Sequence, residues 1–317
     1  MSVPWERAWQ DALYGPDGFY RAQAPAAHFR TASHAAADVL ASALVALARS
    51  AGCGRVGEVG AGRGELLAAL HAADPGLVLA GVDLVPRPDA LPGPVGWGAA
   101  VPPPAGPTLL VAWELLDVVP CPVLEADGDG RLREVLVAPD GTESLGADAS
   151  SDDLSWARRW WPGPYRPGDR VEVGTPRERR WAALVEEALG PDGLALAVDY
   201  DHEAAARPRA GTLASYRAGR LAAAVPDGAH DVTAHVALDA VAAAVPPSVV
   251  LRQHEALARL GVAPVRPDPA DAVRDPAGYL AALARWSRVH ELADPGGLGG
   301  CGWLLHARGG AATHALA

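Results

Sequence analysis

The stretch GEVGAGRGE, residues 57–65, decides the fold that the rest of the sequence builds. It overlaps the end of a short apolar run, RVGEV at 55–59, and leads into GELLAALHAA at 64–73, a run with good helix formers. A glycine-rich turn between a strand and a helix usually holds a nucleotide-like ligand. The residues around this turn indicate which ligand it fits.

A dinucleotide-binding turn has the spacing G-x-G-x-x-G. Here the glycines stand at 60, 62 and 64, so the third comes one residue early, and Glu58 lies where its carboxylate would repel a pyrophosphate. S-adenosylmethionine (SAM) carries a sulfonium and an amino group, which a carboxylate attracts. Asp83 ends the next apolar run, a position from which a carboxylate can accept hydrogen bonds from ribose hydroxyls. A tight turn without a ligand is the alternative, and the two acids disfavour it.

Apolar runs that alternate with helical patterns predict a parallel, doubly wound α/β sheet. The amphipathic pattern at 34–49 predicts a helix that precedes the first strand. We expect strands at 55–59, 77–84, 108–114, 194–200 and 302–307, and further helices at 64–73, 176–190, 236–245 and 276–292. Two β-type runs around a D-G-D-G turn predict an antiparallel hairpin at 121–137, and we expect residues 201–235 to be mostly loop.

Composition excludes several classes of protein. A net charge of −11 disfavours nucleic acid as the main partner, because a phosphate backbone requires a concentrated basic surface. The three cysteines are too few and too far apart for a disulfide framework or a zinc site, and no apolar run predicts a leader or a membrane span. The chain has no Lys, Ile or Asn, which indicates a G/C-biased genome, so its many arginines are weak evidence of function. We therefore expect a cytoplasmic protein.

A set of motifs in a fixed order is similar to the MidA-like family of SAM-dependent methyltransferases. The motifs are GFY at 18–20, HFRTAS at 28–33, EVGAGRGELL at 58–67, VAWELLDVVPCPVLE at 111–125, REVLV at 133–137, VDYDH at 198–202, GTL at 211–213 and DVTAHVALDAV at 231–241. The resemblance covers about residues 10–305 and implies a Rossmann-like class I methyltransferase fold with methyl transfer as the activity. The family includes mitochondrial complex I assembly factors that methylate arginine.

The family block after the fourth strand is typically Asn-Glu-Phe-Phe-Asp-Ala-Leu-Pro, and this chain keeps both acids as Glu114 and Asp117. Carboxylates at the carboxyl end of a parallel strand could hold a guanidinium through charge-assisted hydrogen bonds. We predict both as catalytic. In the alternative interpretation, Glu114 caps the next helix and Asp117 faces solvent.

Two residues depart from the family pattern. A family glutamate is replaced by His34, and the Asn before the retained glutamate is replaced by Trp113. These changes leave open a second hypothesis, a SAM-binding assembly or scaffolding protein that no longer transfers methyl groups. A third, a nicotinamide-dependent oxidoreductase, is disfavoured by the glycine spacing.

These motifs predict the cofactor-binding and substrate-side residues. We expect the cofactor SAM to be bound by Glu58, Gly60, Ala61, Gly62, Gly64, Asp83, Leu84 and Trp113, and no metal to be needed. On the substrate side we expect Tyr20, Thr31, His34, Asp199, His202 and His235, although Asp199 could instead be a cap, and the last two histidines could be buried structural residues.

We expect residues 1–50 to form a helical segment covering the active site, and 51–317 a methyltransferase domain with a substrate-side insertion at about 121–170. The expected partner is a protein substrate, with arginine first, rather than nucleic acid or a membrane, and a homodimer is left open.

Overall fold

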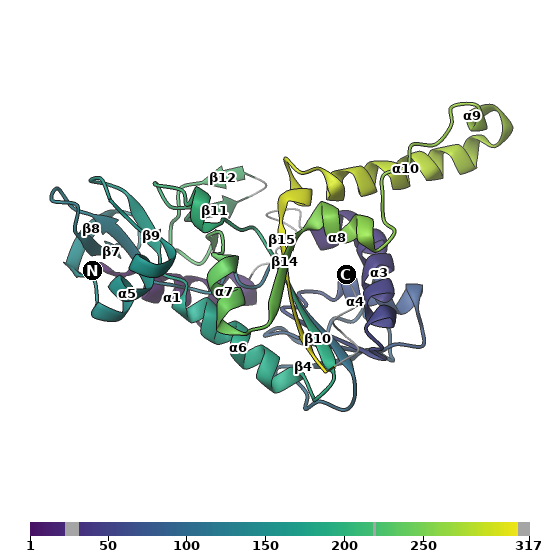
Figure 1. Ribbon diagram of the computed structural model, residues 1–317, viewed down its shortest axis with the longest axis horizontal. Coiled ribbons are helices and arrows are strands. Elements are labelled where there is room, and N and C mark those ends of the chain that lie inside the picture. The colour runs from purple at the N-terminus through teal and green to yellow at the C-terminus, as the bar shows by residue number, and fades with distance from the viewer. Residues whose placement is uncertain (23–31, 218–219, 310–317) are drawn as a thin grey trace. The chain divides into compact units, whose positions relative to one another are not determined.

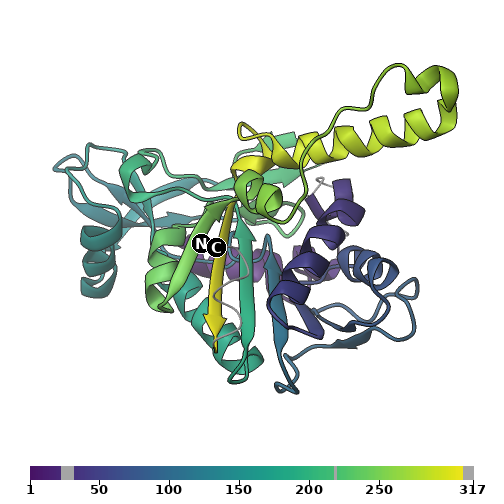
Figure 2. The ribbon, with the colours of Figure 1, turned by 45° about the vertical axis from the view of Figure 1, so that its right-hand side comes forward.

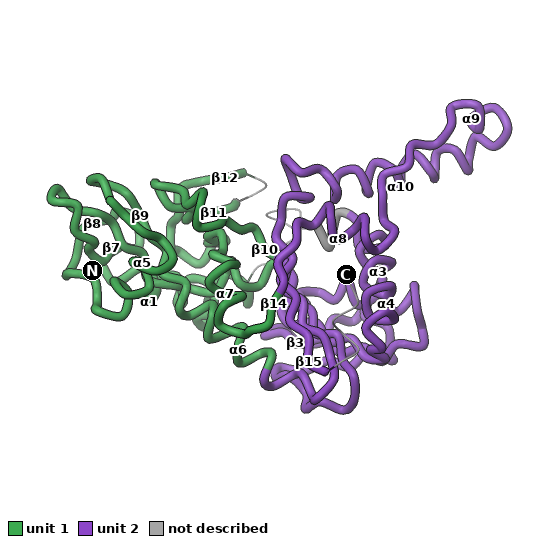
Figure 3. Tube along the Cα trace, in the orientation of Figure 1, with its two compact units in different colours: residues 1–30, 114–185, 199–248 green, residues 31–113, 186–198, 249–317 purple. Residues whose placement is uncertain are grey.

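The computed structural model describes residues 1–22, 32–217 and 220–309. The chain forms two compact units, each built from three separate segments (Figure 3). Unit 1 comprises Met1–Arg30, Glu114–Val185 and Asp199–Ser248, and unit 2 comprises Thr31–Trp113, Glu186–Val198 and Val249–Ala317. Among the helices of the described ranges, none is both long and apolar enough to span a membrane.

Unit 2 is built on a seven-stranded sheet with the order β14-β15-β10-β5-β2-β3-β4 (Figure 1). The strands are β2 (Arg55–Val59), β3 (Val78–Val82), β4 (Gly96–Gly98), β5 (Thr108–Trp113), β10 (Gly193–Asp199), β14 (Ser248–Arg252) and β15 (Gly302–Arg308). From β10 to β4 all neighbours pair in parallel. The central strands β5 and β10 are almost wholly buried, as expected for continuous apolar runs covered on both faces.

The strand register places candidate residues on one face of this sheet, near the carboxyl ends of its strands. Glu58 pairs with Val111 of β5, and β5 ends two residues later at Trp113. Because side chains alternate along a strand, Glu58, Val111 and Trp113 project from the same face.

Helices α3 (Ala32–Ser50) and α4 (Glu65–Ala73) pack side by side in unit 2 (Figure 2). The unit also contains α8 (Gln253–Arg259), α9 (Asp271–Arg274), α10 (Pro276–Ala293) and the 3-10 turn η3 (Leu298–Gly300). An ion pair between Arg288 and Asp38, 2.9 Å long, joins α10 to α3. The first half of α10 extends away from the rest of the unit, and the buried residues of the helix are Val289 and Leu292 near its end (Figures 1 and 2).

Unit 1 contains two smaller sheets. A five-stranded sheet has the order β1-β7-β6-β9, with β8 paired to β7, and a three-stranded sheet has the order β12-β11-β13. The strands are β1 (Val3–Pro4), β6 (Val123–Ala126), β7 (Leu132–Val137), β8 (Glu143–Asp148), β9 (Arg170–Glu172), β11 (Ala214–Arg217), β12 (Arg220–Ala222) and β13 (Asp231–Thr233). The helical elements are α1 (Trp5–Tyr14), α2 (Phe19–Ala22), α5 (Ser151–Trp160), α6 (Thr175–Ala188), η2 (Ala204–Ala206) and α7 (Leu238–Ala244), and the end of α6 belongs to unit 2.

Most predicted elements are present. The α/β class, the parallel pairing from β10 to β4 and the hairpin β6–β7 are confirmed. Residues 201–235 are mostly loop, as predicted, but they also contain the short strands β11, β12 and β13, which were not expected, and neither were β14 and α8. The domain boundary after residue 50, and the role of residues 1–50 as a cover for the active site, stay predictions.

Candidate active site

The glycine turn follows β2 and runs into α4. Gly60, Gly62 and Gly64 have φ angles of 74°, 57° and 76°, a left-handed region that favours glycine. A Cβ atom at Gly64 would lie 2.6 Å from Leu91 Cδ1, so a side chain there would have to displace Leu91 in addition to adopting the left-handed backbone. A Cβ at Gly62 would meet no atom within 4 Å, so the turn is open there to a ligand.

Asp83 follows β3 and holds the turn. Its Oδ2 atom accepts the Gly62 N–H at 2.8 Å, and its Oδ1 atom accepts the Val85 N–H at 3.1 Å. A carboxylate has about four acceptor positions, so both oxygens can still accept hydrogen bonds from ribose hydroxyls. The neighbouring Leu84 is exposed, and Ala61 in the turn is buried.

Glu58 is buried within unit 2 without a compensating charge. It is 4% exposed, and its Oε2 atom has no hydrogen-bond partner among the described residues. Burial raises the pKa of Glu58 well above its usual value, and the nearby acids Glu65 and Asp83 act in the same direction. A cation bound beside this carboxyl would favour its ionised form.

Trp113 ends β5 and is 6% exposed. Its ring contacts Trp303 edge to face, with centroids 5.7 Å apart. The Trp113 Nε1 atom is buried and has no acceptor among the residues that the structure describes. Since an indole N–H usually finds an acceptor when buried, this donor is available to a ligand on the face that also carries Glu58.

A strained turn follows β5 in unit 1. Glu114 has a φ of 49° and is the one described residue other than glycine with a positive φ. Asp199 accepts the N–H of Leu116 at 3.2 Å and the N–H of Asp117 at 3.1 Å, so it caps this turn. Asp199 therefore acts as a cap, which was the alternative to its predicted role on the substrate side.

Asp117 lies inside unit 1 at 6% exposure, so the interpretation that it faces solvent is wrong. Its Oδ2 atom accepts the Thr233 hydroxyl at 2.9 Å, whereas its Oδ1 atom has no donor among the described residues. Burial raises the pKa of Asp117, and the Thr233 hydrogen bond and the charge of Arg177 oppose that rise.

Arg177 is a buried arginine in the same unit as these acids, and it was not predicted from the sequence. It is 1% exposed and donates to the carbonyl oxygens of His235 at 2.8 Å, Val119 at 3.3 Å and Asp117 at 3.3 Å. Its guanidinium also lies 5.7 Å from the ring centroid of Trp9. Arg177 thus ties the turn after β5 to the segment after β13 through backbone atoms, and nothing in the local sequence PRERRW signals this.

Asp231 is a further acid that sequence reasoning did not select, although it opens the DVTAHV block. It is 3% exposed and accepts the Tyr20 hydroxyl at 2.9 Å. Burial, followed by the charge of Asp117, raises the pKa of Asp231 to about 7. The structure therefore brings Tyr20, Asp117, Asp199 and Asp231 together in one unit.

The predicted histidines have different surroundings. The Nδ1 atom of His202 lies 2.6 Å from Arg207 Nη1, and its ring meets Trp161 edge to face. Burial lowers the pKa of His202 to about 3, so the ring is neutral and accepts from Arg207 through Nδ1. His235 stacks on Tyr200 with centroids 5.8 Å apart.

The backbone N–H of His235 donates to Thr212, whose hydroxyl donates to Glu172, so the TAHV and GTL motifs are linked. His34 lies in α3, and Thr31 lies outside the described residues.

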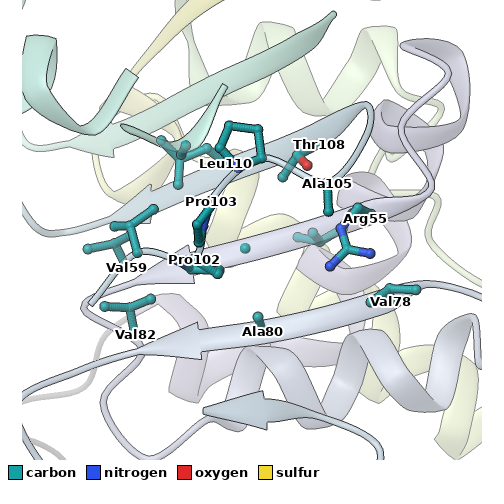
Figure 4. Close-up of a pocket in the computed structure, with 15 residues that line it drawn as sticks. Arg55, Val59, Val78, Ala80, Val82, Pro102, Pro103, Ala105, Thr108 and Leu110 are labelled. Atoms are coloured by element: carbon teal, nitrogen blue, oxygen red, sulfur yellow. The ribbon is translucent and has the colours of Figure 1, made fainter. Parts of the chain in front are cut away.

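A small cavity lies on the face of the seven-stranded sheet opposite to the face that carries Glu58 (Figure 4). The cavity has a volume of about 30 Å³. The residues that line it include Val59, Val82, Leu110, Pro102 and Pro103. Such a space holds one or two water molecules, so it is a packing gap and not the ligand site. Among the described residues no group of three or more His, Cys, Asp or Glu side chains is placed to hold a metal ion.

Comparisons with known proteins identify the family of the chain and structures of similar fold. Residues 79–251 match the model of a family described as "Putative S-adenosyl-L-methionine-dependent methyltransferase". No curated protein matches the chain.

Two crystal structures from Burkholderia thailandensis are similar in fold. One is a COG1565 superfamily member, described as a candidate methyl transferase and bound to S-adenosyl-homocysteine, with 22% identity, a TM-score of 0.78, and 97% of this chain and 88% of that chain covered. The other is an uncharacterised protein of the same superfamily, with 23% identity, a TM-score of 0.74, and 97% and 87% covered. The cofactor of the matched family is SAM.

Proposed function

The chain belongs to this family of S-adenosyl-L-methionine-dependent methyltransferases, and we propose that it methylates a protein side chain, with arginine the first choice. We further propose a Rossmann-like class I arrangement, which the strand order β10-β5-β2-β3-β4 and its parallel pairing support. The MidA-like motifs support the same assignment. A cytoplasmic location, a protein partner and a homodimer belong to the proposal.

The residues of unit 2 fit the cofactor. The open backbone at Gly62 leaves room beside the turn, Asp83 offers acceptors for hydroxyl groups, and the buried acid Glu58 complements a positive charge. SAM supplies an electrophilic methyl group on a sulfonium sulfur. The remaining requirement is to align a nucleophile and to exclude water from it.

We propose arginine as the acceptor because the buried acids of unit 1 have few cations around them. Among the described residues, neither Asp117 nor Asp231 forms an ion pair, and the guanidinium of Arg177 is directed at carbonyl oxygens. Buried carboxyls of this kind stay protonated or bind a cation. A guanidinium fits best, because its planar donors form paired hydrogen bonds with carboxylates.

The chain's residues then have separate roles. Glu114, held in a strained backbone conformation, contributes a carboxylate that can orient the guanidinium. Asp117 is positioned by Thr233 and by the cap from Asp199. These acids increase the nucleophilicity of one guanidinium nitrogen by accepting the proton that it loses on methylation.

The alternative function is a SAM-binding scaffold without transfer activity, which the departures at His34 and Trp113 favour. A transfer assay with radiolabelled methyl SAM, on cell lysate and on arginine-rich and lysine-rich peptides, separates the two. We expect label in protein and methyl-arginine by mass spectrometry. Label in lysine would reject arginine, and SAM binding with no labelled component would favour the scaffold.

A further inference from the structure

We infer that Trp113 donates its indole N–H to the carboxylate of the methionine portion of SAM, and that Trp303 and Gln253 are positioning residues which fix the Trp113 ring for this contact. The inference rests on the cofactor part of the proposed function and is independent of the methyl acceptor. It gives unit 2 a recognition site for the amino-acid end of the cofactor, with Glu58 as the partner of the ammonium group.

Two buried polar groups on one face of the seven-stranded sheet carry the inference. Among the described residues, the Nε1 atom of Trp113 has no acceptor and the Oε2 atom of Glu58 has no donor, although the two residues are only 6% and 4% exposed. Glu58 pairs with Val111 in the register of β2 and β5, and Trp113 lies two residues further along β5 on the same face. A donor and an acceptor that lie on one face and do not bond to each other are both satisfied by a third group that offers an acceptor and a donor.

The amino-acid end of SAM is such a group. Its α-carbon bears an ammonium group, which is a donor with positive charge, and a carboxylate, which is an acceptor with negative charge. The carboxyl of Glu58 attracts the ammonium group, and the carboxylate on the same carbon then lies close to a neighbouring donor. An indole N–H can only donate, and hydrogen bonds to charged acceptors are stronger than those between neutral groups. The carboxylate is therefore the part of SAM that fits Trp113 best.

A chain of buried contacts holds the Trp113 ring. Trp303, on β15, is wholly buried and meets this ring edge to face, with centroids 5.7 Å apart. The Trp303 Nε1 atom donates to Gln253 Oε1 at 3.1 Å, and Gln253 Nε2 donates to the carbonyl oxygens of Leu292 and Leu298, both at 3.0 Å. The polar side-chain atoms of Trp303 and Gln253 thus have partners, whereas the Trp113 N–H has none among the described residues. These contacts orient the Trp113 ring and leave its N–H to a ligand.

Isothermal titration calorimetry with ligands that differ at one group tests the contact. Trp113→Phe keeps an aromatic ring and removes the N–H, so the affinity for SAM should fall about ten- to a hundredfold, as for one hydrogen bond to a charged group. The affinity for decarboxylated SAM should fall much less, because this ligand keeps the ammonium, the sulfonium and the adenosine and lacks only the carboxylate. Equal losses for the two ligands, or no loss for SAM, would overturn the inference.

Trp181→Phe is the matched control. It removes the same N–H from an indole of unit 1 that is also buried and also has no acceptor among the described residues, so the affinities for both ligands should stay at their wild-type values. A loss of SAM affinity as large as that in Trp113→Phe would assign the effect to a general loss of stability and would count against the contact.

The positioning role is tested by the ratio of the affinities for SAM and decarboxylated SAM. Trp303→Leu removes the ring that holds Trp113 and should lower this ratio, whereas Trp303→Phe keeps an edge-to-face partner and should retain most of it. Gln253→Leu leaves the Trp303 N–H without its acceptor and should also lower the ratio. When Trp113→Phe is already present, Trp303→Leu should lower it no further. A purely structural role would weaken both ligands together and leave the ratio unchanged, which would reject the positioning.

A spectroscopic measurement on the wild type does not depend on the folding of any variant. With ¹⁵N-labelled tryptophan, one of the ten indole N–H signals should move on addition of S-adenosyl-homocysteine and not on addition of methylthioadenosine, which lacks the amino-acid end. Absence of such a signal in a protein that binds SAM overturns the inference and leaves the proposed function intact. Absence of SAM binding by the wild type rejects the proposed function, and the inference with it.

Discussion

Asp83 accepts the backbone N–H of Gly62 at 2.8 Å, so the end of β3 fixes the turn that follows β2. One carboxylate thereby shapes the ligand-side backbone and keeps acceptor capacity for the ligand. Gly62 and Asp83 can be tested separately, since Gly62 supplies open space and Asp83 supplies hydrogen bonds.

Gly62→Asn should abolish most SAM binding. Asparagine tolerates the left-handed backbone of Gly62 better than other residues with a Cβ, so the fold should survive while the side chain fills the open space. Isothermal titration calorimetry with SAM measures the loss. Gly57→Ala is the matched control, because a Cβ there also meets no atom within 4 Å and points to the other face of β2, so affinity should be unchanged. Wild-type affinity in folded Gly62→Asn would remove this turn from the site.

Asp83→Ala should weaken SAM and S-adenosyl-homocysteine equally, by about 1.5–3 kcal/mol, the range for hydrogen bonds to a charged group. The two ligands share the ribose and differ in charge at sulfur, so an equal loss indicates that Asp83 acts on the part that they share, through the hydroxyls or through the turn at Gly62. The melting temperature should also fall, because the N–H groups of Gly62 and Val85 lose their acceptor. A loss confined to SAM would mean that Asp83 acts on the sulfonium charge.

Glu114→Gly should separate stability from activity. The φ of 49° costs a residue with a Cβ on the order of 1 kcal/mol, so glycine should maintain or raise the free energy of unfolding. Transfer should fall about a hundredfold in this variant and in Glu114→Gln, which keeps the shape and removes the charge. Urea unfolding and the transfer assay measure the two effects. Wild-type turnover in Glu114→Gln would make Glu114 structural.

The free energy of unfolding should decrease as the pH rises from about 4 to about 7. Asp231 has a pKa raised from 3.8 to about 7 in the folded chain, so the folded state binds more protons than the unfolded state across this interval. The loss is on the order of 4 kcal/mol, since one pKa unit corresponds to about 1.4 kcal/mol. Urea unfolding at several pH values should show a flatter dependence for Asp231→Asn, which keeps an acceptor for Tyr20. An equal slope in both proteins would assign the effect to other acids.

The elements of the candidate cofactor site in unit 2 are predicted from the sequence because their signals are local. Strand β2, the glycine turn and Asp83 are recognised from short runs and their spacing, and β2 and the start of α10 agree with the predicted bounds. The strands β11, β12 and β13 were missed because each has only three or four residues, with polar side chains and no clean alternation.

The acid cluster of unit 1 depends on contacts that no local pattern encodes. The hydrogen bond from Tyr20 to Asp231 joins positions 211 residues apart, and that from Asp117 to Asp199 joins positions 82 residues apart. Arg177 stands in a run with two other arginines, PRERRW, and only the fold distinguishes the buried one. Burial and pairing of such residues follow from the tertiary structure alone.

The division of each unit into three segments determines when each can fold during synthesis. Unit 1 lacks β13 and α7 until the ribosome has passed residue 244, and the seven-stranded sheet of unit 2 lacks β15 until residue 308 has been made. A nascent chain of about two hundred residues therefore exposes the apolar strand β10 before its neighbour β15 exists. Production of this protein should accordingly depend on chaperones or on slow synthesis more than its size suggests, and neither unit can be expressed as one continuous fragment.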